Sequence, residues 1–246
     1  PTGEGLIPGE SIDRLEDVGK WMAVNGESVY GTQASPFKQL SWGRCTRKTT
    51  TSGAILYLHV FDWPSNGTLK LQGVLNTPER VYLLSDAERK PLDLKRENDA
   101  LVIGLPGNAP DTVNSVIVVE VTGKLDITDP PEFKTAYDQF VDTLSIAIFT
   151  DRENVEIRYN FETTEPGPAS TLYTKPCQIR STTTVNARCF RDGKPVSGTA
   201  TRVFVKENPL PAVALKGRKA LKQGIAYRYY EGKWDSLPDF QSLKPV

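Results

Sequence analysis

The chain has 246 residues, in which 30 lysines and arginines balance 30 aspartates and glutamates. Because the net charge is zero, electrostatics gives no reason to expect binding to nucleic acid or to an anionic membrane. The sequence contains no run of about 18 apolar residues, so it predicts no membrane-spanning helix. The length suits one to three domains.

The histidine and cysteine content argues against a metal site. His59 is the single histidine, and the three cysteines, Cys45, Cys177 and Cys189, include no Cys-x-x-Cys pair. We therefore expect no metal site and no cofactor. A free, buried thiol is the expected state of each cysteine, with a Cys177–Cys189 disulfide as the alternative.

The first predicted element is an amphipathic helix that follows Pro8-Gly9. Ser11 is the expected N-cap, and Asn25-Gly26 is the expected left-handed stop. Apolar residues recur at three- and four-residue spacing and form one stripe: Ile12, Leu15, Val18, Gly19 and Met22. A helix of roughly 14 residues is not stable alone, so this stripe needs a surface to cover. That surface is either the side of the β domain that follows or a domain that precedes Pro1.

After a connector over 31–39, the pattern changes to that of β-structure. Residues 55–61 are apolar on both faces, which predicts a central strand and gives His59 a core position rather than a catalytic one. Ser65-Asn66-Gly67 predicts a hairpin turn. Further short strands are predicted at 69–71, 80–84, 92–94, 101–105 and 116–121. Such spacing without helices predicts an antiparallel β-sandwich over 34–126.

The second half of the chain predicts a smaller module. Residues 127–139 contain Pro130-Pro131 and are expected to be a linker. Strands at 144–149, 155–161, 183–190 and 198–205, with a hairpin at Asp192-Gly193, predict an immunoglobulin-like β-sandwich over 140–206. Residues 207–246 are expected to be a linker and the truncated start of a third module. The predicted fold is therefore mainly β, with one N-terminal helix and two sandwiches.

The sequence offers no catalytic constellation. A glycosidase needs two carboxyl groups about 5–10 Å apart on rigid elements, and no pair is placed so by the pattern. No serine or cysteine has a partner base in the sequence pattern. Three tryptophans are candidate platforms for stacking a sugar ring, namely Trp42, Trp63 and Trp234. Their alternative role is packing at the edge of a sandwich.

Four segments resemble known families. The residues PTGEGLIP, Asp13-Arg14-Leu15 and VGKWMAVNGESVYGT (18–32) resemble the end of the barrel of a bacterial α-L-fucosidase of glycoside hydrolase family 29. The run LSWGRCT (40–46) resembles the opening of that family's C-terminal β-sandwich. Residues 155–198 resemble the immunoglobulin-like module at the C-terminus of chitobiases and hexosaminidases, with Glu162-Thr163 where that family usually has Asp-Gly. Tyr229-Tyr230-Glu231-Gly232 and Leu237-Pro238-Asp239-Phe240 resemble the start of a protective-antigen-type carbohydrate-associated module.

The resemblance implies a parent enzyme that is a retaining fucosidase. Its aspartate nucleophile and its general acid/base would both lie in a (β/α)₈ barrel upstream of Pro1, so no catalytic residue is carried over. Residues 1–33 would be the last helix and the exit of this missing barrel, and the opening PTGEG suggests a fragment. The expected partners are the missing catalytic barrel and a fucosylated glycan, in the periplasm or outside the cell.

Two functions follow from these observations. The first is a non-catalytic C-terminal accessory region of an α-L-fucosidase that supports the barrel and binds carbohydrate. The alternative is a stand-alone non-catalytic module for glycan binding or adhesion.

Overall fold

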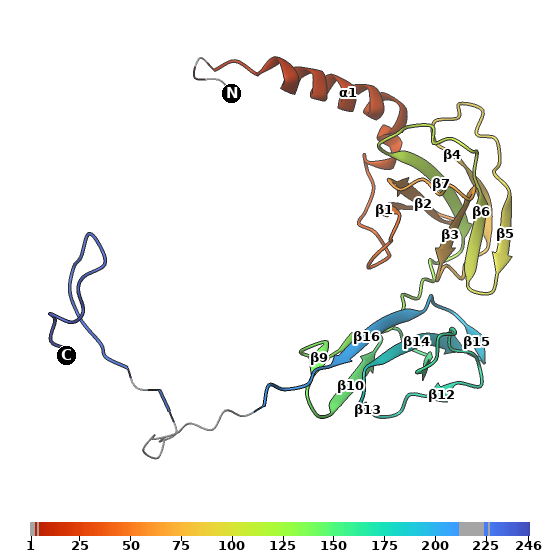
Figure 1. Cartoon of the computed structure of the whole chain (residues 1–246). Coiled ribbons are helices and arrows are strands. Elements are labelled where there is room, and N and C mark those ends of the chain that lie inside the picture. Colours follow the sequence, from red (N-terminus) through yellow and green to blue (C-terminus); the bar gives the residue numbers. More distant parts are fainter. Residues whose placement is uncertain (1–2, 4, 212–223, 226) are drawn as a thin grey trace. The chain divides into compact units, whose positions relative to one another are not determined.

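The computed structural model describes residues 3, 5–211, 224–225 and 227–246. The chain falls into two compact units, residues 1–208 and 209–246. The first unit holds one α-helix and all the strands of the described residues (Figure 1). The fold class is as predicted: mainly β, with one N-terminal helix and antiparallel sheets. Among the described residues, no helix is long and apolar enough to cross a bilayer.

The helix α1 spans Gly9–Asn25 and is longer than predicted. Ser11 is not its N-cap: Pro8 holds that position, and its carbonyl accepts from the amides of Ser11 and Ile12. The predicted left-handed stop at Gly26 is also wrong, because Gly26 is right-handed and starts the 3-10 helix η1, Gly26–Ser28. The Ser28 hydroxyl donates to Asn25 O at 2.7 Å, which holds this turn helical. The first positive φ after α1 is at Gly31.

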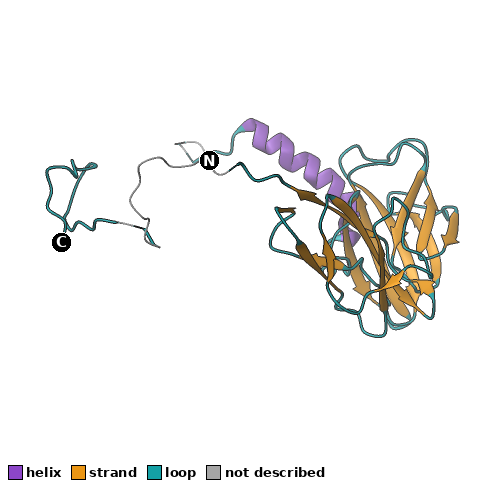
Figure 2. Cartoon of the chain, turned by 60° about the horizontal axis from the view of Figure 1, so that its bottom comes forward, coloured by secondary structure: helices purple, strands orange, loops and turns teal. Residues whose placement is uncertain are grey.

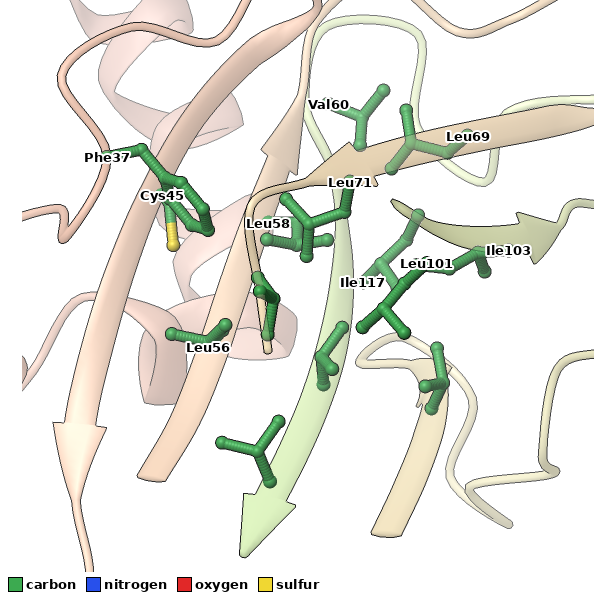
Figure 3. Close-up of a cluster of buried hydrophobic side chains, with 14 of the residues drawn as sticks. Phe37, Cys45, Leu56, Leu58, Val60, Leu69, Leu71, Leu101, Ile103 and Ile117 are labelled. Carbon is green, nitrogen blue, oxygen red and sulfur yellow. The ribbon is translucent and has the colours of Figure 1, made fainter. Parts of the chain in front are cut away.

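The first sandwich consists of two antiparallel sheets. One has the order β1-β2-β7-β4 and the other the order β3-β6-β5. Their strands are β1 Gly43–Thr49, β2 Gly53–Val60, β3 Thr68–Gln72, β4 Pro78–Leu83, β5 Leu94–Glu97, β6 Ala100–Gly104 and β7 Ser115–Thr122. β2 is an interior strand, as its two apolar faces predicted. Leucines, isoleucines and valines from the two sheets meet in one buried cluster (Figure 3).

The turn at 65–67 forms, but it does not close a hairpin. Gly67 has a φ of +70°, and Asn66 Oδ1 accepts from Thr68 N at 3.1 Å. The strands that it joins, β2 and β3, lie in different sheets. Both edges of β2 are already paired, with β1 and β7, so β3 has no edge of β2 to join.

The second sandwich follows from residue 132. Its sheets have the orders β13-β10-β8 and β12-β11-β14-β16-β9, and β15 pairs with β14. The strands are β8 Glu132–Lys134, β9 Gln139–Phe140, β10 Leu144–Phe149, β11 Glu156–Asn160, β12 Thr171–Leu172, β13 Cys177–Ile179, β14 Thr183–Arg191, β15 Lys194–Pro195 and β16 Ala200–Lys206. The predicted hairpin at Asp192-Gly193 is present, between β14 and β15. β9 pairs with β16 in parallel, with Val205 N donating to Asp138 O and Glu207 N to Phe140 O.

Polar contacts join the two sandwiches within the first unit. Asp99, in the turn between β5 and β6, pairs with Arg188 of β14, and both side chains are buried. Asp126 accepts from the guanidinium groups of Arg152 and Arg191. The segment predicted as a linker is held in place, because Thr128 N donates to Gly73 O at 3.0 Å and the segment includes β8. The predicted domain boundaries stay predictions.

The three cysteines are free and buried, which is the state expected for them. Cys45 lies in the core of the first sandwich, and Cys177 lies in the core of the second. Cys189 is buried on β14, on the face that it shares with Val185 and Ala187.

Candidate docking helix and glycan-binding groove

The C-terminal end of α1 is fixed to the first sandwich. Trp21 Nε1 donates to Asn114 O at 2.7 Å, and the Trp21 ring lies 6.2 Å from the ring of His59. Thr46 Oγ1 donates to the carbonyl of Ser28 at 2.5 Å. Figure 2 shows the helix meeting the strands of the sandwich at this end. These contacts set the direction in which α1 leaves the sheet.

A charged network supports the same end of the helix. Glu27 of η1 accepts from Tyr57 OH at 2.8 Å and from Arg89 Nη2 at 3.0 Å. Arg89 Nη1 also donates to Tyr82 OH, which in turn donates to Glu120. Burial, reinforced by the bond to Glu120, raises the pKa of Tyr82 to about 12. The phenol therefore stays a hydrogen-bond donor at neutral pH.

The apolar stripe of α1 is exposed beyond this anchored end. The exposed fractions are 45% for Ile12, 62% for Leu15 and 56% for Val18. Met22, one turn later, is half-buried. The stripe therefore does not pack on the sandwich that follows, which was one of its two expected partners.

His59 has the structural role that the sequence predicted. It is buried in β2, with Nε2 3.4 Å from Thr46 Oγ1 and Nδ1 3.2 Å from Asn114 Nδ2. Burial lowers the pKa of His59, so the ring is neutral at pH 7. The neutral ring of His59 helps to hold the C-terminal end of α1, because Thr46 and Asn114, whose side chains it contacts, also bind η1 and α1.

The three candidate tryptophans lie in different surroundings. Trp63 packs against the core of the first sandwich, and its Nε1 donates to Pro106 O at 3.1 Å. Trp234 belongs to the second unit, where it is 43% exposed and its ring lies 6.4 Å from that of Phe240. Trp42 is half-buried and lines a groove. Their roles in sugar binding stay predictions.

The groove beside Trp42 has a volume of about 810 Å³. It is lined by residues from both sandwiches and from the segment between them, including Asn66, Lys70, Gln72 and Asp129. Sequence reasoning missed these polar residues. They come from separate segments, and no local pattern brings such segments together.

Lys38 organises the charges on one side of this groove. Its Nζ donates to Glu132 Oε1 at 2.8 Å and lies 3.0 Å from Asp151 Oδ2. The hydrogen bonds to Glu132 and then Asp151 raise the pKa of Lys38 to about 12. Burial raises the pKa of Asp129, whose carboxylate accepts from the Lys38 amide. Because Lys38 holds Glu132 and Asp151, these two carboxylates are not a free acid and base pair.

Comparison with known proteins identifies two regions. Residues 136–201 match the family model of the chitobiase/beta-hexosaminidase C-terminal domain. Tissue α-L-fucosidase of Homo sapiens is 32% identical over 118 residues, which are 46% of this chain and 24% of that protein. The enzymes of Macaca fascicularis and Dictyostelium discoideum are 31% and 28% identical over similar lengths.

The chain matches the C-terminal part of α-L-fucosidases. Both resemblances seen in the sequence, to a fucosidase and to the hexosaminidase-type module, are thereby confirmed. A bacterial origin stays a prediction. The chain spans about a quarter of the length of these relatives, since it covers 24% of the first of them.

Solved fucosidase structures also resemble parts of the chain. α-L-Fucosidase isoenzyme 1 from Paenibacillus thiaminolyticus superposes with a TM-score of 0.43 and 31% identity, over 50% of this chain and 29% of its own. The enzyme from Vibrio sp. strain EJY3 superposes with a TM-score of 0.44 and 18% identity, over 82% of this chain and 39% of its own. The similarity to α-L-fucosidases rests on the sequence matches and not on these superpositions.

Proposed function

We propose that this chain is the non-catalytic C-terminal accessory region of an α-L-fucosidase, and that α1 packs its apolar stripe against the catalytic domain. The observation that carries the proposal is the contrast along α1. Hydrogen bonds fix its C-terminal end, while Ile12, Leu15 and Val18 are exposed. A helix held in one direction with an apolar stripe in water is suited to receive a partner surface.

The free energy gained by burying the stripe of α1 would be large enough to stabilise such a contact. Burying a large aliphatic side chain contributes about 1.5–3 kcal/mol relative to leaving it in water. Three such side chains at successive turns would contribute several kcal/mol before the entropic cost of ordering. The catalytic domain is the proposed partner because the relatives that match this chain are α-L-fucosidases.

The test compares two substitutions on α1, in the isolated chain and in the full polypeptide encoded by the reading frame that contains it. Leu15→Glu places a charge in the stripe. Val24→Glu is the matched control, since Val24 is also exposed and lies nine residues on, about half a turn away around the helix.

We expect Leu15→Glu to leave the melting temperature of residues 1–246 unchanged, but to lower both the melting temperature and the fucosidase activity of the full polypeptide. Val24→Glu should change neither protein. Equal effects of the two substitutions, or no effect of Leu15→Glu in the full polypeptide, would refute the docking role. Turnover of 4-nitrophenyl α-L-fucoside by residues 1–246 alone would refute the non-catalytic assignment.

A second candidate function, binding of a fucosylated glycan, is favoured by the groove beside Trp42. An aromatic ring and several amide, hydroxyl and carboxylate groups line it, which is the combination that stacks and hydrogen-bonds a sugar. We expect Trp42→Ala to abolish binding to fucosylated oligosaccharides on an array, and Trp63→Phe to retain it. Retained binding by Trp42→Ala, or none by the unaltered chain, would refute this function.

A further inference from the structure

A second pocket of the first sandwich carries a concentration of unpaired positive charge. It has a volume of about 390 Å³ and lies where the turn between β1 and β2 meets the end of β7. Arg47 and Lys124 line it together with Thr50, Thr51 and Ser52, and none of its lining residues is acidic. Neither cationic side chain has a hydrogen-bond or ion-pair partner among the described residues.

Arg47 provides the strongest indication that this pocket can bind an anion. It follows Cys45 by two residues on β1, so its stem lies on the face that covers the core. Its Nε is buried and has no partner among the described residues. A buried donor without a partner is costly, and a ligand that accepts from the guanidinium would remove that cost.

The turn that faces Arg47 is rigidly held and presents further donors. Thr50 N donates to Gly53 O, and Gly53 N donates back to Thr50 Oγ1, both at 3.0 Å. Gly123, with a φ of +76°, donates to Ser52 O at 2.8 Å and so ties the turn to the end of β7. The hydroxyls of Thr51 and Ser52 have no partner among the described residues and line the pocket. The backbone that carries these two hydroxyls is therefore already held in place before a ligand binds.

We propose that this pocket binds a sulfate or phosphate group, either free or as a monoester on a sugar. Arginine matches such an oxyanion with two parallel N–H donors, lysine adds a point charge, and the serine and threonine hydroxyls can donate to the remaining oxygens. The proposal is independent of the fucosidase assignment, because it rests on residues of the first sandwich alone.

The test titrates residues 1–246 with inorganic sulfate, inorganic phosphate, N-acetylglucosamine 6-sulfate and unmodified N-acetylglucosamine, and records the amide spectrum. We expect saturable shifts at Thr51, Ser52 and Gly53 with the anions, and none with the neutral sugar. Tighter binding of the sugar sulfate than of inorganic sulfate would identify a glycan ester as the ligand, and equal binding would identify the free ion.

Three variants locate the site. Arg47→Gln and Lys124→Gln should each weaken binding by at least about tenfold, the usual effect of losing a charged hydrogen-bond partner. Lys48→Gln is the control, because Lys48 neighbours Arg47 on β1 but lies on the opposite face. Should Arg47→Gln fail to fold, Lys124→Gln carries the test, since Lys124 is exposed. The proposal is overturned by the absence of saturable shifts, or by a loss of affinity in Lys48→Gln that equals the loss in Lys124→Gln.

Discussion

The ion pair between Asp99 and Arg188 offers the sharpest test of how the two sandwiches are joined. The two side chains are 2% and 8% exposed, and they come from the β5–β6 turn and from β14. Arg188 has two further partners: Nη1 donates to Glu165 Oε2 at 2.9 Å and Nε to Ser197 O at 2.8 Å. The substitution to make is Asp99→Ala, which leaves the guanidinium buried but removes its closest counter-charge.

The expected cost follows from this geometry. Removing one member of a buried pair typically costs about 3–5 kcal/mol. Because Arg188 keeps Glu165 and Ser197, we expect about 2–4 kcal/mol for Asp99→Ala. In a unit of this size each kcal/mol lowers the melting temperature by about 2–4 °C, so the shift should be roughly 5–15 °C.

Calorimetry and urea titration of residues 1–246 would measure both quantities. Glu97→Ala is the matched control in the same hairpin, since Glu97 pairs with Lys70 at 3.8 Å while both side chains are more than half exposed. It should cost less than about 1 kcal/mol. The double variant Asp99→Leu/Arg188→Met should be more stable than Asp99→Ala, because it leaves no buried charge unpaired. An Asp99→Ala cost equal to that of Glu97→Ala would refute the reasoning.

Three further predictions concern single side chains. Trp63→Ala should lower the melting temperature by several degrees, because the ring packs on the core and its Nε1 bonds to Pro106 O; an unchanged melting temperature would instead favour the sugar-platform role. The pKa of His59 is lowered by burial, so the unfolded chain binds the proton more readily, and urea titrations should show stability falling as pH drops through about 6.5. That fall should be smaller in His59→Gln, and an identical pH profile would contradict it. The thiols of Cys45, Cys177 and Cys189 should react with a disulfide reagent only after unfolding, since all three are buried and burial raises the pKa of Cys45 to about 12; rapid reaction of the folded chain would contradict this.

Local patterns predicted most of the longer strands but missed the short strands β8, β9, β12, β13 and β15. They also failed where pairing or direction depends on distant residues. The two apolar faces of β2 predicted an interior strand, because period-two burial is a property of the segment itself. Asn66-Gly67 predicted a turn, but which strands the turn joins depends on the pairing of β2 with β1 and β7. The end of α1 was misjudged at Gly26, since contacts of Ser28 and Trp21 with other segments and with the helix keep that turn right-handed.

In the candidate sites, too, local sequence predicted single features but not the contacts between distant segments. Trp42 was identified from its residue type, whereas Lys38, Gln72 and Asp129 were not, because they reach the groove from three separate segments. The spacing of the apolar residues predicted the stripe of α1. The sequence did not predict that the stripe is exposed to solvent, because its exposure depends on the direction of α1, which Glu27 and its partners fix.

The parallel pairing of β9 with β16 has a mechanical consequence. β9 follows β8 near the start of the second sandwich, β16 is its last strand, and β9 and β16 run in the same direction. A pull at the start of β9 and at the end of β16, in opposite directions, therefore loads the bonds from Val205 N to Asp138 O and from Glu207 N to Phe140 O together, in shear. An unzipping hairpin would instead break such bonds one after another. Forced unfolding is governed by the rate at which the unfolding barrier is crossed. Because these bonds must break together, they raise that barrier against a pull transmitted through the residues after 206.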